Sequence, residues 1–246
     1  MSSQLSTALS TTLSILDAAV RRHRRVVFAT SLGKEDMVLT DLIGRQGLPI
    51  VIFTLDTGKL HTETLALLDD ITARYAIEIE RIAPTQADLD VLAAQQPFDA
   101  IYDSVDSRRA CCNARKVRPL ARALAGANAW ITGQRRAQSI TRAQLPLSEH
   151  DAAHGIEKLN PLALWSSEEV DFYLRNNHVP INALHAQGFP SIGCAPCTRA
   201  IALGEDERAG RWWWEHPEHK ECGLHRNNDN NPRRPIIHIA TASQTV

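Results

Sequence analysis

Three features are scarce or missing in this sequence: long apolar runs, net charge and a targeting segment. No stretch reaches the roughly 20 consecutive apolar residues that a membrane-spanning helix needs. The formal net charge is −1 over 246 residues, so no overall field attracts nucleic acid or an anionic membrane. We therefore expect neither a nucleic-acid nor a membrane partner, and any attraction for an anionic ligand must be local.

Residues 1–25 lack the basic stretch and apolar core of a signal peptide. Apolar residues in this segment recur at nearly helical spacing and predict an amphipathic first helix. These residues are Leu5, Ala8, Leu9, Leu13, Leu16, Ala19 and Val20. We expect a cytoplasmic protein; a mitochondrial address is the alternative.

Apolar segments at 25–30, 49–55, 76–82 and 129–132 read as strands and alternate with helical patterns. This alternation predicts an α/β fold with a mainly parallel twisted sheet and helices on both faces. Polar stretches follow three of the strands, at 31–36, 56–58 and 133–142. Because parallel sheets bind ligands at the carboxyl ends of their strands, we expect these stretches to gather at one edge.

The pattern changes beyond residue 160. A helix is predicted at 168–177, where Ser166 or Ser167 together with Glu169 would cap its start. The chain after this helix is rich in turns. We predict one α/β domain over residues 1–226, in which 190–226 elaborates the same domain. The polar tail 227–246 has the composition of a flexible extension.

The five cysteines are an odd number, which is atypical of a secreted disulfide framework. Cys111 and Cys112 are adjacent, and Cys194 and Cys197 form a C-x-x-C turn. Four thiolates suit zinc or an iron–sulfur cluster. Adjacent side chains diverge, which favours a cluster with several irons over one tetrahedral ion. Spacing alone leaves three readings open: a cluster, zinc, or a redox dithiol without metal.

Cys222 is the remaining thiol, in the segment ECGLH (221–225). The nearby His219, Lys220 and His225 can lower the pKa of this thiol, and a thiolate beside cations is a competent nucleophile. An inert buried cysteine is the alternative. We therefore predict a metal centre and a separate nucleophilic cysteine.

The segment SLGKED (31–36) joins a strand to a helix, where backbone N–H groups and the helix dipole bind phosphate-like anions. It is not a Walker A motif. Arg135, Arg136 and Arg142 follow a strand at the same predicted edge and suit phosphate or sulfate, although solvated arginines are the alternative. Arg208 and Arg211 precede three tryptophans and are candidates to hold an anion beside the Cys222 thiolate.

Together these patterns resemble the assimilatory adenylyl-sulfate reductases, the iron–sulfur branch of the phosphoadenylyl-sulfate reductase family. The matching segments are SLGKED (31–36), LDTGKLHTET (55–64), CCNARKVRPL (111–120), TGQRRAQSITR (132–142), NPLALWSSEEV (160–170), VPINALHAQGFPSIGCAPCTRA (179–200), GRWWWE (210–215) and KECGLH (220–225).

The resemblance implies an adenine nucleotide α-hydrolase-like fold and a [4Fe–4S] cluster on Cys111, Cys112, Cys194 and Cys197. It implies that Cys222 attacks adenosine 5′-phosphosulfate, releases AMP and is cleared by thioredoxin or a glutaredoxin-like dithiol, which yields sulfite. The cluster would act as scaffold and source of field rather than as electron carrier. The expected substrate contacts are Ser31, Gly33, Lys34, Asp56, Thr57, Gly58, Lys116, Arg135, Gln138, Ser139, Arg142, Arg208, Arg211 and His225.

One departure concerns the phosphate loop, which in related ATP-splitting enzymes reads S-G-G-x-D-S. Here Leu32 replaces a glycine and an acid is added, which disfavours a triphosphate. Three rivals remain: reduction of the 3′-phosphorylated substrate, ATP-dependent tRNA thiolation, and a zinc-ribbon-like binding protein without catalysis. The sequence is compatible with a homo-oligomer and does not fix the oligomeric state.

Overall fold

The structure is a computed structural model and describes residues 3–138, 142–216, 220 and 224. The predicted site residues Ser139, Cys222 and His225 and the predicted extension 227–246 lie outside the described residues. The elements follow one another as α1 (Ser3–Arg22), β1 (Val26–Thr30), α2 (Lys34–Gln46), β2 (Ile50–Leu55), α3 (Thr62–Tyr75), β3 (Glu80–Ile82), α4 (Gln86–Gln95), η1 (Phe98–Tyr102), α5 (Val105–Cys112), η2 (Asn113–Val117), α6 (Arg118–Leu124), β4 (Ala129–Ile131), η3 (Arg136–Gln138), β5 (Ser148–Asp151), β6 (Ile156–Leu159), α7 (Ser167–Asn176), η5 (Ala183–Gln187) and η6 (Ala195–Cys197).

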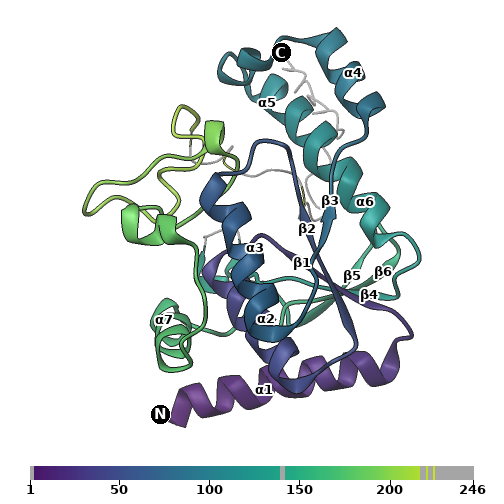
Figure 1. The fold of residues 1–246 in the computed structure, drawn as a ribbon, viewed down its shortest axis with the longest axis vertical. Coiled ribbons are helices and arrows are strands. Elements are labelled where there is room, and N and C mark those ends of the chain that lie inside the picture. Colours follow the sequence, from purple (N-terminus) through teal and green to yellow (C-terminus); the bar gives the residue numbers. More distant parts are fainter. Residues whose placement is uncertain (1–2, 139–141, 217–219, 221–223, 225–246) are drawn as a thin grey trace, which may run out of the picture.

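Six strands form one sheet in the order β3-β2-β1-β4-β6-β5 (Figure 1). Neighbouring strands are parallel except for β5 and β6, which pair antiparallel. From β1 the chain passes to β2 on one side, and it later returns to β4 on the other side. This reversal leaves a crevice outside the carboxyl ends of β1 and β4, the usual ligand position in such sheets. The predicted α/β fold is confirmed.

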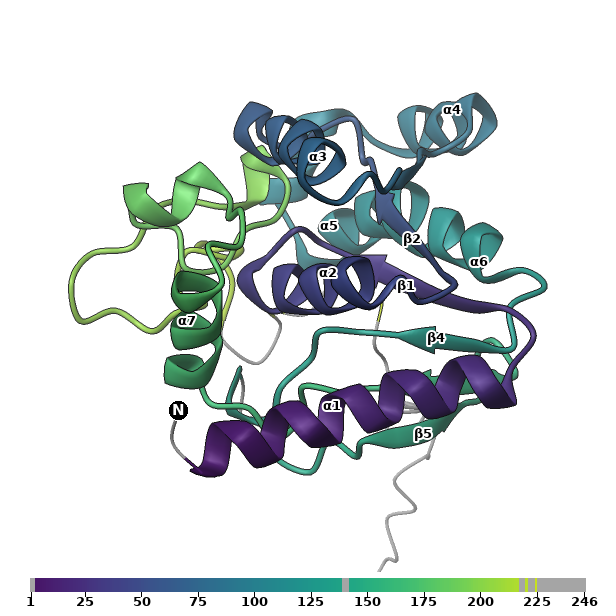
Figure 2. The same cartoon turned by 60° about the horizontal axis from the view of Figure 1, so that its bottom comes forward.

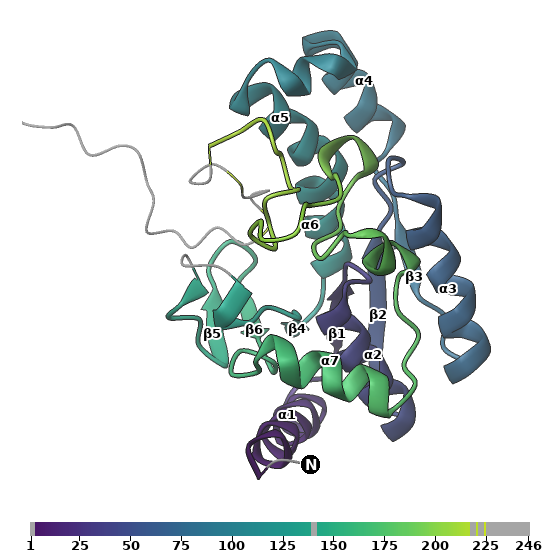
Figure 3. The same cartoon turned by 90° about the vertical axis from the view of Figure 1, so that its left-hand side faces the viewer.

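The sheet separates two apolar clusters, because successive side chains of a strand point to opposite faces. Val26 and Phe28 of β1 pack with residues of α1, α2, α3 and α7. Val27 packs on the other face with Leu120 and Leu124 of α6. Figure 3 shows α6 and α3 on opposite sides of β1 and β2. Burial of these faces fixes the strand register. The register in turn sets the positions of the loops that follow the carboxyl ends of the strands.

Helix α1 is the predicted amphipathic helix and lies across the end of the molecule that comes forward in Figure 2. Leu5, Leu16 and Ala19 bury its apolar side in the first cluster. The capping box predicted for α7 is also present: Glu169 N–H donates to the Ser166 hydroxyl, and Ser166 N–H donates to the Glu169 carboxylate. None of the described helices is both long and apolar enough to cross a membrane.

One strand prediction differs from the structure, and one hairpin was not predicted. The strand expected over 76–82 is only Glu80–Ile82, because Ala76 takes a left-handed φ of 53° that ends α3. The β5–β6 hairpin was not expected at all. Strand β5 reads SEHD, so it carries no apolar alternation that would reveal a strand.

The paired cysteines lie on a helical segment that contains one local irregularity. α5, η2 and α6 follow without a break, but η2 (Asn113–Val117) is a π-helical turn. Such turns often occur at functional sites, because the wider turn re-aims the side chains around it. Here the π turn begins directly after Cys112 and contains Lys116.

Candidate active site

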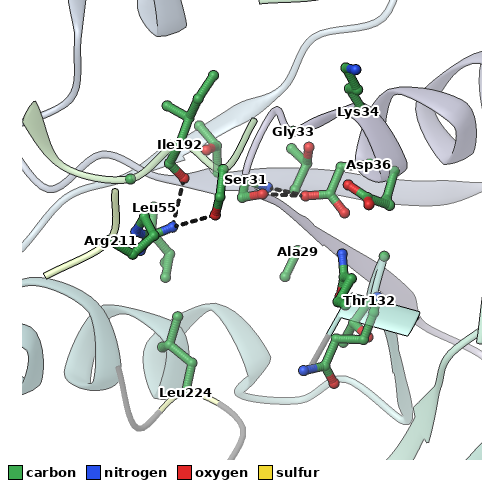
Figure 4. A pocket seen from close by; sticks show the side chains of 18 of the residues that line it. Ala29, Ser31, Gly33, Lys34, Asp36, Leu55, Thr132, Ile192, Arg211 and Leu224 are labelled. Carbon is green, nitrogen blue, oxygen red and sulfur yellow. Dashed lines mark hydrogen bonds between the residues drawn. The ribbon is translucent and has the colours of Figure 1, made fainter. Parts of the chain in front are cut away.

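A cavity of about 240 Å³ opens at the carboxyl ends of β1, β2 and β4 (Figure 4). Its walls include the loops after these strands, which the sequence predicted to gather at one edge. Residues 190–193, 207–208 and 211–212, far downstream, also line it. Nine predicted substrate contacts lie in this lining: Ser31, Gly33, Lys34, Thr57, Lys116, Gln138, Arg142, Arg208 and Arg211.

The loop between β1 and α2 is held by a buried carboxylate. The Ser31 backbone N–H and hydroxyl both donate to Asp36 at 2.6 Å, and the Gly133 N–H donates to it from the loop after β4. Gly133 permits this approach because a Cβ at that position would collide with the Asp36 Oδ1. Burial raises the pKa of Asp36 to about 6, although the hydrogen bonds from Ser31 oppose the shift.

Among the described residues, five lining side chains are cationic: Lys34, Lys116, Arg142, Arg208 and Arg211. Several are held in place by the protein. Lys34 pairs with Asp171 at 2.8 Å, and Arg142 donates to the Gln138 side-chain oxygen at 2.6 Å. Glu35, Asp36 and Glu207 are the acids of the same lining. The excess of positive groups provides the local attraction for anions that the near-neutral chain lacks as a whole.

Arg211 is held by contacts with the backbone and with a tryptophan ring. Its guanidinium donates to the Ile192 carbonyl at 2.9 Å and stacks over the Trp212 ring at 4.7 Å. Gly193 makes room for it, because a Cβ there would lie 2.6 Å from the Arg211 Nη2. Figure 4 shows Arg211 reaching across the cavity wall toward Ile192. A fixed guanidinium suits bidentate contact with phosphate or sulfate.

All four predicted ligand thiols line one pocket beside this cavity: Cys111, Cys112, Cys194 and Cys197. Lys116 and Trp212 line both spaces, so the thiol pocket and the cavity share a wall. The C-x-x-C turn is fixed by backbone bonds, from Ala195 N–H to the Lys59 carbonyl at 2.8 Å and from Trp212 N–H to the Cys197 carbonyl at 3.0 Å.

The electrostatics of the thiols differ along the pocket. Burial, followed by the neighbouring Cys194, raises the pKa of Cys197 to about 12. Burial acts in the same direction on Cys194, but Lys116, the Thr57 hydroxyl and Arg211 together lower its pKa below the ordinary value. The Thr57 oxygen lies 3.2 Å from the Cys194 sulfur. Four thiolates in so buried a space require further positive charge, which a metal centre supplies.

The donor set therefore fits a metal centre chemically: four sulfurs share one pocket that arginines and lysines surround. Within the described ranges, no three His, Cys, Asp or Glu side chains are grouped to hold a single metal ion. The four sulfurs come from two segments, the end of α5 and the η6 turn, that the fold brings together.

Three predicted substrate contacts lie outside the cavity lining: Asp56, Gly58 and Arg135. Asp56 pairs with Arg81 at 2.5 Å and accepts from the Gly58 N–H at 3.0 Å. Arg135 is buried and pairs with Glu35 at 2.7 Å. Their assignment as substrate contacts stays a prediction, as do those of Ser139 and His225, which are outside the described residues.

The described residues on either side of Cys222 in the sequence both relate to the cavity. Leu224 lines it and packs against the second apolar cluster (Figure 4). Arg208, another lining residue, donates to the Lys220 carbonyl at 2.9 Å. Cys222 itself lies outside the described residues, so its role as nucleophile stays a prediction.

Comparison with known proteins decides the family. Residues 25–200 match the phosphoadenosine phosphosulfate reductase domain. The chain is 56% identical to the adenosine 5′-phosphosulfate reductase of Allochromatium vinosum, over 96% of this chain and 92% of that protein. The chain belongs to the phosphoadenosine phosphosulfate reductase family. It is also 53% identical to the adenosine 5′-phosphosulfate reductase of Burkholderia cepacia, over 92% and 93% of the two chains.

One solved reductase structure agrees with membership in this family, and a second solved structure shows the fold alone. The phosphoadenylyl-sulfate reductase of Candida auris, in a phosphate complex, has a TM-score of 0.65 at 26% identity, covering 77% of this chain and 90% of that one. The FMN adenylyltransferase of Candida glabrata shares the fold, with a TM-score of 0.55 at 18% identity over 89% and 77% of the two chains.

Gln134 and His185 are among the polar groups of this reductase family member's cavity that were not predicted as site residues. Gln134 follows Gly133 directly after β4, so its place in the sequence was a usable signal. His185 comes from η5, far along the chain, and only the tertiary structure places it here. Its Nδ1 donates to the Phe189 carbonyl at 2.8 Å, and burial lowers its pKa.

Proposed function

We propose that this chain reduces adenosine 5′-phosphosulfate to sulfite and AMP, in assimilatory sulfate reduction, with a thioredoxin-like or glutaredoxin-like dithiol as electron donor. The observation that carries the proposal is the position of Lys116, which lines both the cationic cavity and the four-thiol pocket. The relatives named adenosine 5′-phosphosulfate reductases, at 56% and 53% identity, support the substrate.

In the first step the Cys222 thiolate attacks the sulfur of the phosphosulfate. An S–S bond forms, the S–O bond to phosphate breaks, and AMP leaves with the electron pair. Negative charge accumulates as thiolate and sulfate approach, so fixed cations lower the barrier. Lys116, Arg208 and Arg211 lie in the cavity where they can contact that anion.

In the second step a thiolate of the external dithiol attacks the Cys222 sulfur. The bond between that sulfur and the sulfonate breaks, and sulfite departs with its electrons. The second thiol of the donor then attacks the resulting mixed disulfide. This regenerates the Cys222 thiolate and leaves the donor as a disulfide, which balances the two electrons.

We propose that Cys111, Cys112, Cys194 and Cys197 hold a [4Fe–4S] cluster. When bound, the cluster would supply positive charge that stabilises the four thiolates and creates a local field beside the cavity. Support comes from the shared pocket and from the cations that border it. A reducing compartment keeps such thiols free, so we also propose a cytoplasmic location.

A second candidate substrate is the 3′-phosphorylated form, which the Candida auris relative's name favours. Comparing kcat/KM for the two substrates decides between them, and a clear preference for the 3′-phosphate would overturn our choice. ATP-dependent tRNA thiolation has less support. Ser31 lies in the loop that would bind a triphosphate, and its backbone N–H already donates a hydrogen bond to Asp36.

The decisive experiment mixes the cluster-loaded protein with adenosine 5′-phosphosulfate in the absence of reductant. Mass spectrometry should find an adduct with the mass of SO3 on the peptide that contains Cys222. The Cys222→Ser variant should form no adduct and no sulfite but keep its iron and acid-labile sulfide. An adduct on another cysteine, or loss of iron from that variant, would contradict the assignment of nucleophile and ligands.

A further inference from the structure

Leu224 lies two residues beyond Cys222 in the sequence, and its side chain reaches the cavity (Figure 4). It is half-buried and packs against the second apolar cluster of the sheet. Leu120 and Trp130 belong to that cluster and also line the cavity. Leu224 therefore joins the segment that contains the predicted nucleophile to the apolar part of the cavity wall.

A second contact holds the chain on the other side of Cys222. Lys220 lies two residues before Cys222. Its backbone carbonyl accepts from the Arg208 guanidinium at 2.9 Å, and its Nζ donates to the Ala209 carbonyl at 3.3 Å. Cys222 lies outside the described residues, but two residues of extended chain span at most about 7 Å. Both contacts therefore act close to the predicted nucleophile.

Leu224 can be changed without touching the groups that bind the anion. Arg208 holds the Lys220 carbonyl but is also one of the cations of the cavity lining, so its removal would disturb the substrate as well. Leu224 has neither a charge nor a hydrogen-bonding group. Half burial of a leucine side chain biases the equilibrium between a docked and a released chain by about tenfold.

The two steps of the proposed reaction place opposite demands on this contact. In the first step the Cys222 thiolate must meet the phosphosulfate beside the cations of the cavity. In the second step the Cys222 sulfur must meet a thiol of another protein. A cavity of about 240 Å³ holds a small molecule, and a protein cannot enter it. A contact that keeps the chain at the cavity wall therefore favours the first step and opposes the second.

We propose that Leu224 is a positioning residue for Cys222. Its apolar contact with the cavity wall holds the segment that carries the nucleophile beside the substrate. The proposal rests on the proposed function, because it requires Cys222 to attack a phosphosulfate in this cavity. The same contact must be given up before a protein dithiol can reach the Cys222 sulfur. Leu224 therefore speeds the first step and slows the second.

The test follows each step separately in cluster-loaded Leu224→Ser. Rapid quenching and mass spectrometry give the rate constant of adduct formation with adenosine 5′-phosphosulfate in the absence of reductant. Saturating substrate separates this rate constant from any change in binding. It should fall about tenfold, because the apolar contact is lost. The purified adduct is then mixed with thioredoxin, and sulfite release should be as fast as in wild type or faster.

Two further variants serve as controls. Leu224→Met keeps an apolar side chain of similar volume and should restore the first step to within about threefold of wild type. Leu203→Ser makes the same chemical change at a fully exposed leucine outside the cavity lining. It should match wild type in both steps. Iron content should be the same in all the proteins, because none of the substitutions touches the four thiols.

An unchanged rate of adduct formation in Leu224→Ser would overturn the proposal. So would a fall in both rate constants, a loss of iron, or a failure of Leu224→Met to restore the first step, since each indicates a general disturbance of the fold. If wild type forms no adduct on Cys222, the proposed function itself fails. If wild type forms the adduct and Leu224→Ser matches it, the proposed function stands and only the role of Leu224 fails.

Discussion

Leu32 stands where the phosphate loop of related ATP-splitting enzymes has a glycine. Its backbone takes a left-handed φ of 62°. A leucine in this conformation costs roughly 1–2 kcal/mol. Its side chain is 1% exposed and belongs to the first apolar cluster, which offsets that cost. The loop thus keeps the backbone of a glycine while gaining a buried anchor.

This balance predicts an unusual order of stability. Leu32→Ala should lower the free energy of unfolding by about 2–4 kcal/mol, because it empties a buried site and keeps the backbone strain. Leu32→Gly should be as stable as Leu32→Ala or more stable, because glycine relieves the strain. Urea unfolding of the two variants checks this. If the glycine variant is clearly the weaker one, strain at Leu32 is not significant.

Asp36 gives a pH dependence whose sign follows from its pKa of about 6, against an ordinary value of 3.8. Between these values the folded state binds the proton more tightly than the unfolded state does. The contribution of Asp36 to stability is therefore fully present below about pH 4 and is lost as the pH rises through 6. Over that range the loss is on the order of 3 kcal/mol.

Asp36→Asn cannot lose a proton, so its stability should lack this component. Urea unfolding of both proteins from pH 4 to pH 7 gives the difference curve, in which other carboxyl groups cancel. Wild type should lose stability relative to Asp36→Asn as the pH rises. A flat difference would show that Asp36 does not titrate in this range.

At the scale of elements, α5 is tied to the tryptophan segment by a buried ion pair. Arg108 and Glu215 side chains are 0% and 3% exposed, and their charged atoms lie 2.7 Å apart. The Arg108 guanidinium also stacks over Trp212 at 4.7 Å. The pair therefore joins the helix that carries Cys111 and Cys112 to the segment that carries Arg211.

Removing one partner strands the other as a buried charge, so Arg108→Met should cost about 3–5 kcal/mol of unfolding free energy. The double variant Arg108→Met with Glu215→Leu should recover most of this loss. Arg109→Met is the matched control on the same helix. The Arg109 side chain is 42% exposed, and its ion pair with the exposed Asp106 is long, at 3.9 Å. Equal effects of Arg108→Met and Arg109→Met would refute the argument.

The π turn between α5 and α6 places Lys116 against both the thiol pocket and the cavity. Lys116→Met should lower kcat/KM for adenosine 5′-phosphosulfate about 100-fold or more, the usual effect of losing one fixed charge at a reacting anion. Lys59→Met is the control, since Lys59 lines only the thiol pocket. If both variants lose activity together with iron, Lys116 acts on the cluster rather than on the substrate.

At the scale of the whole molecule, the thiol pocket lies apart from both apolar clusters of the sheet, which contain none of its four cysteines. Replacing all four by serine should abolish the binding of iron and acid-labile sulfide, and with it the activity. The far-UV circular dichroism of the sheet and its helices should remain, while Tm falls because two distant segments are no longer tied together. A fully unfolded variant would mean that the metal centre is required for the fold itself.

The sequence by itself determined the alternation of strands and helices and the polar loops at one sheet edge. It also showed that the four ligand cysteines occur as two closely spaced pairs near cationic residues. These features depend on local periodicity and on chain connectivity, which a sequence carries directly. Only the tertiary structure decided that Asp36 accepts a hydrogen bond from the Ser31 N–H, that Lys116 lines two sites at once, and that Gln134 is buried in the cavity wall. Each of these depends on side chains from separate elements meeting across the sheet edge, and no local pattern records which atoms meet there.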